Sequence, residues 1–488
     1  MIVLLLVPLL APLSAAALTA ALGWRRVTAW AGVLAALAVL GSGIVLATRI
    51  GDHSHVVAGH LLRADGLSVV MLLVIGTVGA LSCWASIGYL DTELAHGHIT
   101  PPRAQLYGVL VALFLAAMSL AVQANNLGVM WVAIEATTIV TAFLVGHRGT
   151  KAALEATWKY VIICSVGIAF AFLGTVLLYF AGEHAGVPSG RALDFDTLFA
   201  HATQLDPAVA RLAAGLLLIG YGAKAGLAPL HTWLADAHSQ APAPVSALMS
   251  GVLLSVAFSA LLRVKAVLDI TLGPAYLRTG LLVIGLLTLL VAASLLVAQR
   301  DVKRMLAYSS MENMGLLAVA AAAGTRLAIT ALLLHVLAHG VAKTLLFLCA
   351  GQLQSAHNST SFADVTAVLA RSRTLATAFA VGVVALLGLP PFALFASELS
   401  IGRGLTRAHL GWALGIALLV MLVAFAALAV NTSRMLLGTP AAGAPAIALP
   451  ATITGALVVG IVACLALGVT AGPLTHLFGT AATVLGGT

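Results

Sequence analysis

Apolar runs of about twenty residues recur from one end of this chain to the other, and a run of that length crosses the ~30 Å hydrocarbon core of a bilayer as an α-helix. The 488 residues are 61% hydrophobic and only 8% charged, which is outside the usual range of soluble globular proteins. No stretch is polar enough to form a separate soluble domain. The sequence therefore predicts an all-α, polytopic membrane protein built as one unit.

Polar residues divide the chain into fourteen apolar runs, which predicts about fourteen transmembrane helices. The runs lie near residues 2–22, 27–48, 67–90, 105–122, 126–146, 156–181, 209–228, 244–262, 279–298, 305–323, 327–352, 374–400, 409–433 and 450–472. The first run lacks the basic start of a secretory signal, so we expect it to be retained as the first helix. An even number of helices would place both termini on one side of the membrane.

The positions of Lys and Arg in the loops indicate which side that is, because these residues accumulate on the cytoplasmic side. One set of predicted loops carries twelve of them and the other carries ten. This small difference leans toward termini outside the cytoplasm.

Several classes of protein are excluded by composition. The net charge of +8 is spread over short loops, so we expect no nucleic-acid partner. The four cysteines lie apart inside apolar runs with no C-x-x-C pair, so we expect no metal and no cofactor on this chain. The sequence contains no P-loop, dinucleotide-binding glycine motif or nucleophile elbow, which excludes nucleotide hydrolysis and acyl transfer.

Ionisable residues nevertheless stand deep inside the apolar runs. Glu135, Lys224 and Lys343 are placed in this way, and Glu398 follows a Gly-Leu-Pro-Pro break in another run. A charged group at bilayer depth costs ~2.5 to 3.5 kcal/mol or more, so it usually lines a polar pathway. Ion translocation is therefore the first functional hypothesis.

Glu135 and Lys224 form a candidate proton site. A lone carboxylate at this depth is protonated unless a cation lies near it. Partial desolvation lowers the pKa of a lysine, so a neighbouring carboxylate determines whether the lysine keeps its proton. Glu135 lies about two turns inside its run, which argues against a helix-capping role. Asn125 and Asn126 stand at the start of that helix, and a structural role for Glu135 remains the alternative.

His335, His339 and Lys343 follow one another at a spacing of four residues. Each step turns the helix by about 40° and climbs about 6 Å, so the three side chains form a stripe about 12 Å long. Histidine titrates near neutral pH, and the stripe could relay protons along a water wire. The alternatives are a metal site, for which no third ligand is evident, and ordinary buried histidines.

Two Gly/Pro motifs interrupt the predicted helices at corresponding places. GLAP at residues 226–229 interrupts the seventh run, and GLPP at residues 388–391 interrupts the twelfth. Pro229, Pro390 and Pro391 each remove a backbone donor, which a water-lined cavity tolerates and lipid does not. Paired breaks favour internal repeats whose discontinuous helices meet a transport site near the midplane, with simple proline kinks as the alternative.

Glu398, after the second break, is the candidate group for proton exchange with the far side of the membrane. Arg403 and Arg407 follow it, so an interfacial ion pair is the competing interpretation. The polar segments at residues 236–244 and 299–304 are interpreted as structural connections.

At these residues the chain resembles the antiporter-like, proton-translocating subunits of respiratory NADH:quinone oxidoreductase, Mrp-type cation/proton antiporters and membrane-bound hydrogenases. The resemblance covers roughly residues 65–435 and is carried by LHTWLADA at 230–237, PVSAL at 244–248 and QRDVKR at 299–304. IEATT at 134–138, WKYVIICSVG at 158–167 and YSSMENMG at 308–315 are most similar to the hydrogenase-4 component F branch, which belongs to formate-hydrogenlyase-type assemblies.

This resemblance implies a fourteen-helix core, two inverted five-helix repeats with discontinuous helices 7 and 12, a polar axis across the membrane plane and termini on the outer face. The corresponding parts are a three-helix segment (1–104), two repeats (105–265 and 266–436) and a C-terminal helix and tail (437–488).

The resemblance also assigns residues to a relay. By position, the matching residues are Glu135 and Lys224 for the essential Glu/Lys pair, His335, His339 and Lys343 for the central relay, and Glu398 for the terminal group. Ser250 and Ser255 stand where certain relatives carry a His or a Lys, so the relay could be interrupted there.

Together these features predict a non-catalytic, proton-translocating subunit of a multi-subunit redox complex of hydrogenase-4 type in the inner (plasma) membrane. Its expected partners are other membrane subunits, a peripheral redox arm, the lipid bilayer and protons, with Na⁺ as an open alternative. The other interpretations are an Mrp-like antiporter subunit, a subunit of NADH:quinone oxidoreductase, and a catalytic redox enzyme in its own right.

Overall fold

The computed structural model describes residues 1–51, 54–439, 445–470 and 472–487, and nearly all of its regular structure is helical. The longer helices are α1 (Ile2–Leu22), α2 (Arg26–Arg49), α3 (Gly66–Ala95), α4 (Pro101–Gln123), α5 (Leu127–Val145), α6 (Lys151–His184), α8 (Pro207–Lys224), α11 (Leu254–Leu272), α12 (Pro274–Val297), α13 (Val302–Ala323), α14 (Arg326–His357), α16 (Arg373–Leu386), α17 (Ala393–Arg407), α18 (Gly411–Leu436) and α19 (Ala451–Thr470). The shorter elements are β1 (His55–Val57), β2 (Leu62–Ala64), η1 (Gly146–Arg148), η2 (Ser189–Arg191), α7 (Phe195–Ala200), η3 (Ala202–Gln204), α9 (Trp233–Gln240), α10 (Ala243–Leu248), η4 (Met249–Leu253), α15 (Val368–Arg371), η5 (Gly472–Leu474) and α20 (Thr475–Val484).

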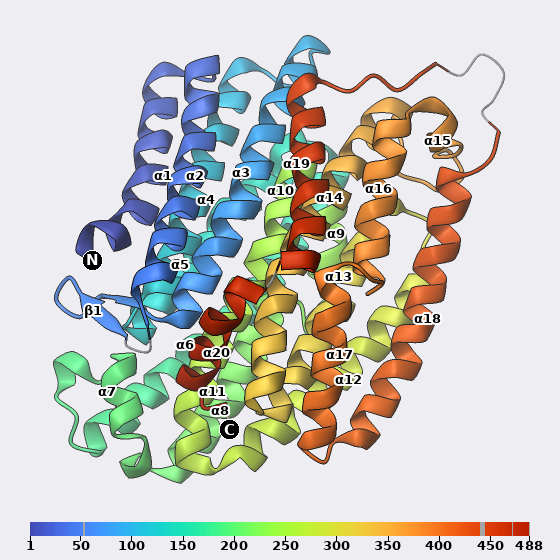
Figure 1. Cartoon of the computed structure of the whole chain (residues 1–488). Helices are drawn as coiled ribbons and strands as arrows, with labels where there is room; N and C mark the ends of the chain where they lie inside the picture. The colour runs from blue at the N-terminus through green and yellow to red at the C-terminus, as the bar shows by residue number, and fades with distance from the viewer. Residues whose placement is uncertain (52–53, 440–444, 471, 488) are drawn as a thin grey trace.

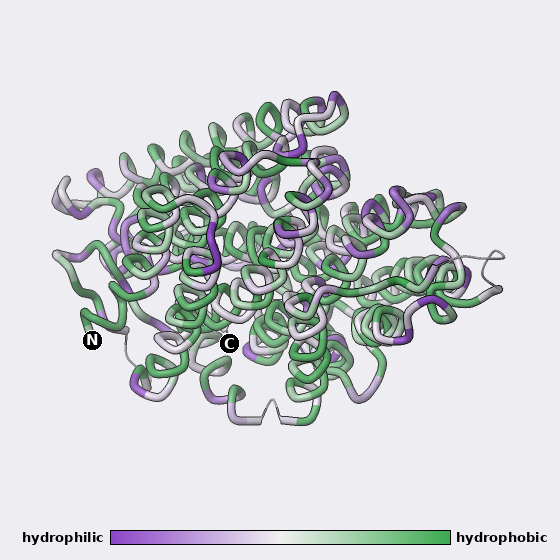
Figure 2. Tube along the Cα trace, turned by 90° about the horizontal axis from the view of Figure 1, so that it is seen from above, coloured by the Kyte–Doolittle hydropathy of each residue, from purple (hydrophilic) through white to green (hydrophobic). Residues whose placement is uncertain are grey.

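The long helices stand side by side in one bundle, with α1 and α2 at one edge and α18 at the other (Figure 1). Seen along the helices, most of the chain is hydrophobic and the hydrophilic stretches are short (Figure 2). α3, α11 and α14 are almost wholly buried, whereas α18 and α19 expose apolar side chains. This arrangement is the all-α membrane architecture that the apolar runs predict.

Each of the fourteen predicted runs contains helix. Among the helices in the described ranges, eleven are long and apolar enough to cross a membrane. The three remaining runs hold α8, α13 and the pair α16 and α17. Fourteen crossings, like the two repeats, therefore remain a prediction.

Side-chain caps fix where the two most informative helices begin. Asn126 accepts hydrogen bonds from the backbone N–H groups of Gly128 (3.0 Å) and Val129 (3.2 Å) at the start of α5. Thr325 accepts from the N–H of Ala328 (3.2 Å) at the start of α14. These side chains satisfy backbone donors that the first helical turn leaves free. The cap of α5 is thus Asn126, and Glu135 has no part in it.

The eighth predicted helix is longer than its predicted limits of 244–262. It runs from Ala243 to Leu272 and contains one π-helical segment, η4, which carries Ser250. Arg263 and Lys265 follow the predicted limit and would be loop charges if the helix ended at residue 262. Both are buried, with partners in Asp65 and Asp269, and so they extend the helix instead of ending it. The predicted boundary after residue 265 lies inside α11, and the division into repeats remains untested.

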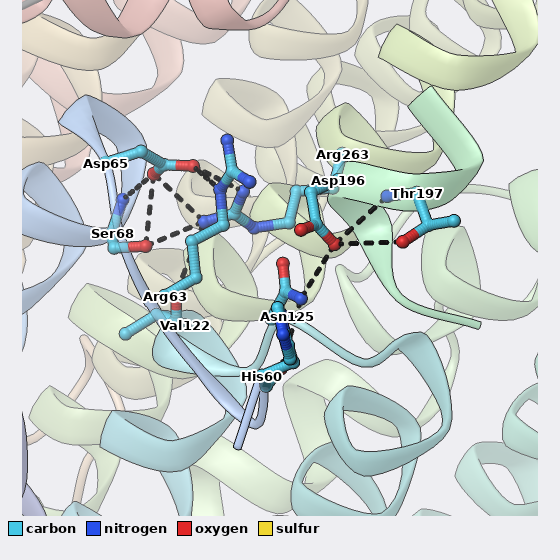
Figure 3. A network of polar contacts seen from close by, with 9 residues as sticks. All are labelled: His60, Arg63, Asp65, Ser68, Val122, Asn125, Asp196, Thr197 and Arg263. Atoms are coloured by element: carbon cyan, nitrogen blue, oxygen red, sulfur yellow. Dashed lines mark hydrogen bonds and ion pairs between the residues drawn. The ribbon is translucent and has the colours of Figure 1, made fainter. Parts of the chain in front are cut away.

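A buried polar network, which the sequence analysis did not anticipate, joins the hairpin of β1 and β2 to the helices. The Asp65 carboxylate accepts from Arg263 (2.8 and 3.0 Å) and from Arg63 (2.7 Å), and Asn125 donates to Asp196 (3.0 Å), as Figure 3 shows. Burial favours the neutral acid, but Arg263, Arg63 and the N–H of Ser68 outweigh it and hold the pKa of Asp65 well below its usual range. This network ties α3, α7 and α11 together at one end of the bundle.

Both Gly/Pro motifs lie where a helix is interrupted. α8 ends at Lys224 and α9 begins at Trp233, with Pro229 between them. α16 ends at Leu386 and α17 begins at Ala393, with Pro390 and Pro391 between them. Polar groups of the first break are satisfied by tertiary contacts, because Ala228 N–H donates to Thr288 (2.9 Å) and the Trp233 indole donates to the Ala223 carbonyl (3.0 Å).

Candidate functional site

Lys224 lies at the end of α8 among hydroxyl groups. It is fully buried, and its ammonium donates to Thr138 Oγ1 (2.8 Å) and Tyr160 Oη (2.6 Å). Tyr160 Oη also bonds to Thr141 Oγ1 (2.5 Å), and the ammonium lies 4.8 Å from the centre of the Tyr160 ring. Lys224 is thus held by neutral acceptors on α5 and α6, which can also accept or pass on a proton.

Glu135 forms no ion pair with this lysine. Within the described chain, no oxygen of Glu135 lies in ion-pair range of Lys224, and Glu135 Oε2 is buried without a hydrogen-bond partner. Glu135 and Thr138 line the same cavity of about 510 Å³ between α5 and α6, together with the exposed Trp158. In the predicted Glu/Lys pair, the lysine is therefore hydrogen-bonded to the Thr138 hydroxyl, and the carboxylate of Glu135 faces the cavity.

His335, in the middle of α14, connects three helices. Its Nε2 lies 2.8 Å from Asn313 Oδ1 on α13, and its Nδ1 lies 2.9 Å from Ser397 Oγ on α17. Asn313 Nδ2 donates to the Ser309 carbonyl (2.7 Å), which orients the amide and makes Oδ1 the acceptor for Nε2–H.

This geometry accommodates both charge states of His335. Ser397 Oγ also lies 2.8 Å from the Leu394 carbonyl. When the imidazole is neutral, the Ser397 hydroxyl donates to Nδ1; when it is protonated, Nδ1–H donates to Ser397 and the hydroxyl turns to Leu394. A single hydroxyl rotation therefore satisfies either state, as a proton-carrying histidine requires.

His339 lies one turn further along α14 and stacks on His335, with ring centres 6.3 Å apart and planes 16° apart. It is fully buried, and neither ring nitrogen has a hydrogen-bond partner among the residues described. Unpartnered buried nitrogens are rare in ordinary cores. The two histidines thus differ: His335 is hydrogen-bonded to side chains of α13 and α17, whereas the ring nitrogens of His339, unpartnered within the described residues, are free to bind a proton carrier.

Lys343 completes the stripe and is linked indirectly to Ser250, the residue at which the relay could be interrupted. The Lys343 ammonium donates to the Leu306 carbonyl (2.8 Å) and to Ser309 Oγ. Ser310 Oγ bonds to the same carbonyl (3.0 Å) and to Ser250 Oγ (2.7 Å). Ser250 is therefore linked to the lysine through Ser310 and the Leu306 carbonyl, both on α13. Ser255 Oγ has no partner in the described part of the chain.

Glu398 lies directly against the second helix break. Gly388 has a φ of +61°, which favours glycine, and a Cβ at this position would lie 2.1 Å from Glu398 Oε2, so a larger residue would displace the carboxyl group. Arg403 lines a neighbouring cavity of about 450 Å³ with Glu398. No ion pair joins Glu398 to Arg403 or Arg407 in the described ranges, so the competing ion-pair interpretation has no support here.

Sequence reasoning missed three polar side chains at this site. Tyr160 holds Lys224, Glu312 lines a cavity with Glu398, and His238 on α9 is fully buried, stacked on Phe347 with ring centres 5.2 Å apart. Tyr160 and Glu312 fall in motifs that carried the resemblance, and His238 fell in a segment interpreted as a connection. The signal for Tyr160 and Glu312 was a polar residue inside a predicted apolar run, whereas His238 lies between two runs and had no such signal.

The other polar segment does make structural contacts. Lys303 is fully buried and donates to the carbonyls of Ser239 (3.0 Å) and Ala241 (2.7 Å) at the end of α9. Arg304 pairs with Asp236. Among the described residues, no three His, Cys, Asp or Glu side chains are grouped to hold a metal ion, and the four cysteines are unpaired.

Comparisons with known proteins agree with this architecture. A profile of the family described as "NADH:quinone oxidoreductase/Mrp antiporter, TM" matches residues 124–425. The chain is 38% identical to a hydrogenase-4 component F homolog of Methylacidiphilum infernorum over 342 residues, which cover 70% of this chain and 71% of that protein.

Two solved complexes contain chains of the same fold. One is the archaeal membrane-bound sulfane sulfur reductase, with a TM-score of 0.86 and 22% identity over 99% of this chain and 97% of that one. The other is the Mrp complex of a Dietzia species, with a TM-score of 0.87 and 21% identity over 100% and 98% of the two chains. At these identities the likeness shows the fold alone.

Proposed function

Because this chain belongs to the NADH:quinone oxidoreductase/Mrp antiporter family of membrane proteins, we propose that it is the proton-translocating subunit of a multi-subunit redox complex of hydrogenase-4 type. The observation that carries the proposal is the series of ionisable groups that runs from the half-buried Glu135 on α5, through the fully buried Lys224 on α8 and Lys343, His339 and His335 on α14, to the half-buried Glu398 on α17. Lys224, Lys343 and His335 are hydrogen-bonded to neighbouring helices. Ionisable groups inside a bilayer are costly, so such a series is expected only along a polar path.

The first half of the path comprises Glu135, Thr138, Lys224 and Tyr160. A change of charge or hydration at the Glu135 cavity alters the electrostatic potential at Lys224, which then loads or releases a proton through its hydroxyl partners. Because neutral groups hold Lys224, releasing the proton breaks no ion pair in the described structure.

His238 joins the two halves in this proposal. It lies on α9, directly after the first break, and packs on Phe347, one turn beyond Lys343 on α14. Its ring nitrogens have no hydrogen-bond partner within the described residues, so they are available to a proton carrier. The proton then passes to Lys343, along His339 and His335, and leaves through Glu398.

We further propose that the chain works in the inner (plasma) membrane with both termini on the outer face. Its partners are other membrane subunits and a peripheral redox arm that supplies the driving electron transfer. The 38% identity to a hydrogenase-4 component F homolog supports the hydrogenase-type assembly over the two alternatives, an Mrp-like antiporter subunit and a subunit of NADH:quinone oxidoreductase.

The test is proton pumping into inverted membrane vesicles by the assembled complex. We expect Glu135→Gln and Lys224→Ala to abolish pumping while electron transfer continues, because each removes a titrating group from the path. Glu155→Gln, an exposed carboxylate at the start of α6, is the matched control and should pump normally. Unchanged pumping in both test variants would refute the relay, and Na⁺-dependent exchange without electron transfer would favour the antiporter alternative.

A further inference from the structure

A cavity beside the second helix break contains two carboxylates, of which the relay above uses only one. It has a volume of about 220 Å³ and is called the exit cavity here. Its polar lining is Glu312 and Asn313 of α13 and Glu398 of α17. Its remaining walls are apolar side chains of α13, α16 and α18 and the start of the second break. The exit cavity is therefore a low-dielectric space with two acids in its wall.

Glu312 is unusual among the buried polar residues. Only 7% of its surface is exposed, and its carboxyl group makes no hydrogen bond and no ion pair with any residue that the structure describes. The neighbouring side chain, Asn313, is fully engaged with His335 and the Ser309 carbonyl. Burying an ionisable group without a partner costs free energy, so Glu312 is not explained by packing.

Glu312 also lies between the central stripe and the terminal residue. His335 contacts Asn313, the residue after Glu312, and Ser397, the residue before Glu398. Both Glu398 and Lys343 act electrostatically on Glu312. Glu398 lines the same cavity as Glu312, and Lys343 lies on a different helix, α14.

Two carboxyl groups that face one mostly apolar cavity resist ionising together, and their titrations are coupled. We propose that Glu312 and Glu398 form a two-carboxylate exit site that holds one shared, exchangeable proton; this rests on the proposed proton relay. A proton that has reached His335 passes into the pair, and Glu398 releases one through the exit cavity, so that one proton enters and one leaves. Glu312 accepts the arriving proton while Glu398 releases the departing one, so the two protons occupy different carboxyl groups.

The experiment uses the assembled complex with Glu312→Gln, Glu398→Gln and the double variant. Because the two residues act as one unit, we expect each single change to abolish proton pumping, with no further loss in the double variant. Glu312→Asp, which keeps a carboxyl group, should restore part of the pumping. Glu155→Gln again serves as the control.

A second readout separates a shared proton from a structural role. Reaction-induced infrared difference spectra report the C=O bands of protonated carboxyl groups during turnover. The band that disappears in Glu398→Gln is assigned to Glu398. We expect Glu312→Gln to shift or remove this band. The spectra are compared at equal amounts of assembled complex, so that a loss of folding is recognised separately.

The outcomes distinguish this site from the relay itself. Normal pumping and an unshifted Glu398 band in Glu312→Gln would overturn the two-carboxylate site, while pumping lost in Glu398→Gln would leave the relay standing. If Glu312→Gln shifts the Glu398 band but both single variants pump normally, the two carboxyl groups share a proton and the proposed relay is wrong. Binding of Na⁺ that both Gln variants abolish would replace the shared proton with a cation and overturn the proposal.

Discussion

At the scale of residues, the ionisable groups could be found from the sequence, but their partners could not. Glu135, Lys224 and Lys343 are conspicuous because a charge inside an apolar run is costly. Thr138 and Tyr160, which hold Lys224, are ordinary residues in their own segments, 86 and 64 residues away from the lysine. Only the packing of α5 and α6 on α8 shows that they belong to the site.

The hydroxyl of Tyr160 should matter as much as the charge it contacts. Tyr160→Phe removes one of two acceptors of the Lys224 ammonium, and a hydrogen bond to a charged group contributes ~1.5–3 kcal/mol. We expect pumping to fall roughly tenfold or more, since about 1.4 kcal/mol corresponds to a factor of ten. Initial rates of vesicle acidification measure this effect.

Tyr179→Phe is a matched control on the same helix. Its hydroxyl donates to Glu183 (2.8 Å) near the end of α6, away from Lys224, and its loss should leave pumping unchanged. Equal losses in both variants would mean that the effect arises from α6 in general and not from the Lys224 site.

At the scale of elements, the helices and both interruptions could be predicted, whereas several ends could not. Apolar runs mark helices because a bilayer satisfies no backbone groups. The limit at residue 262 was wrong because Arg263 is paired inside the protein with Asp65, 198 residues earlier in the chain. The hairpin of β1 and β2 and helix α7 were missed because their stability comes from this same tertiary network and not from local pattern.

Any side chain at Gly388 should displace the carboxyl group of Glu398. Gly388→Ala would place a methyl group on the Glu398 carboxyl group, and the positive φ adds a backbone strain of about 1 kcal/mol. We expect the complex to assemble and pumping to be lost, as vesicle acidification would show. Gly411→Ala, whose methyl group meets open space, is the control. Pumping in Gly388→Ala at the level of Gly411→Ala would show that the position of the carboxyl group is not critical.

The Asp65 network should be a main source of stability at its end of the bundle. Asp65→Asn leaves Arg263 and Arg63 buried without their anion, and breaking a buried pair in this way costs about 3–5 kcal/mol. We expect a clearly lower midpoint of thermal unfolding for the purified complex. Asp206→Asn, at an exposed cap of α8, should change the midpoint only slightly. Equal midpoints for the two variants would contradict a stabilising role for the network.

At the scale of the whole molecule, the class of protein could be predicted from composition and the family from short motifs. The orientation of the termini stays a prediction. Two of the ten positive charges counted on one side, Arg263 and Lys265, lie within α11 and pair with Asp65 and Asp269 inside the protein. The polar series crosses most of the bundle, from α5 to α17, which no single segment of sequence could reveal.

The central claim is that protons cross the membrane along this series. The most direct test is the number of protons translocated per electron by the assembled complex with Lys343→Gln, which interrupts the path at its middle. Our account predicts that this ratio falls to the value set by any other proton-pumping subunits while electron transfer continues. A ratio equal to that of the unaltered complex would contradict it.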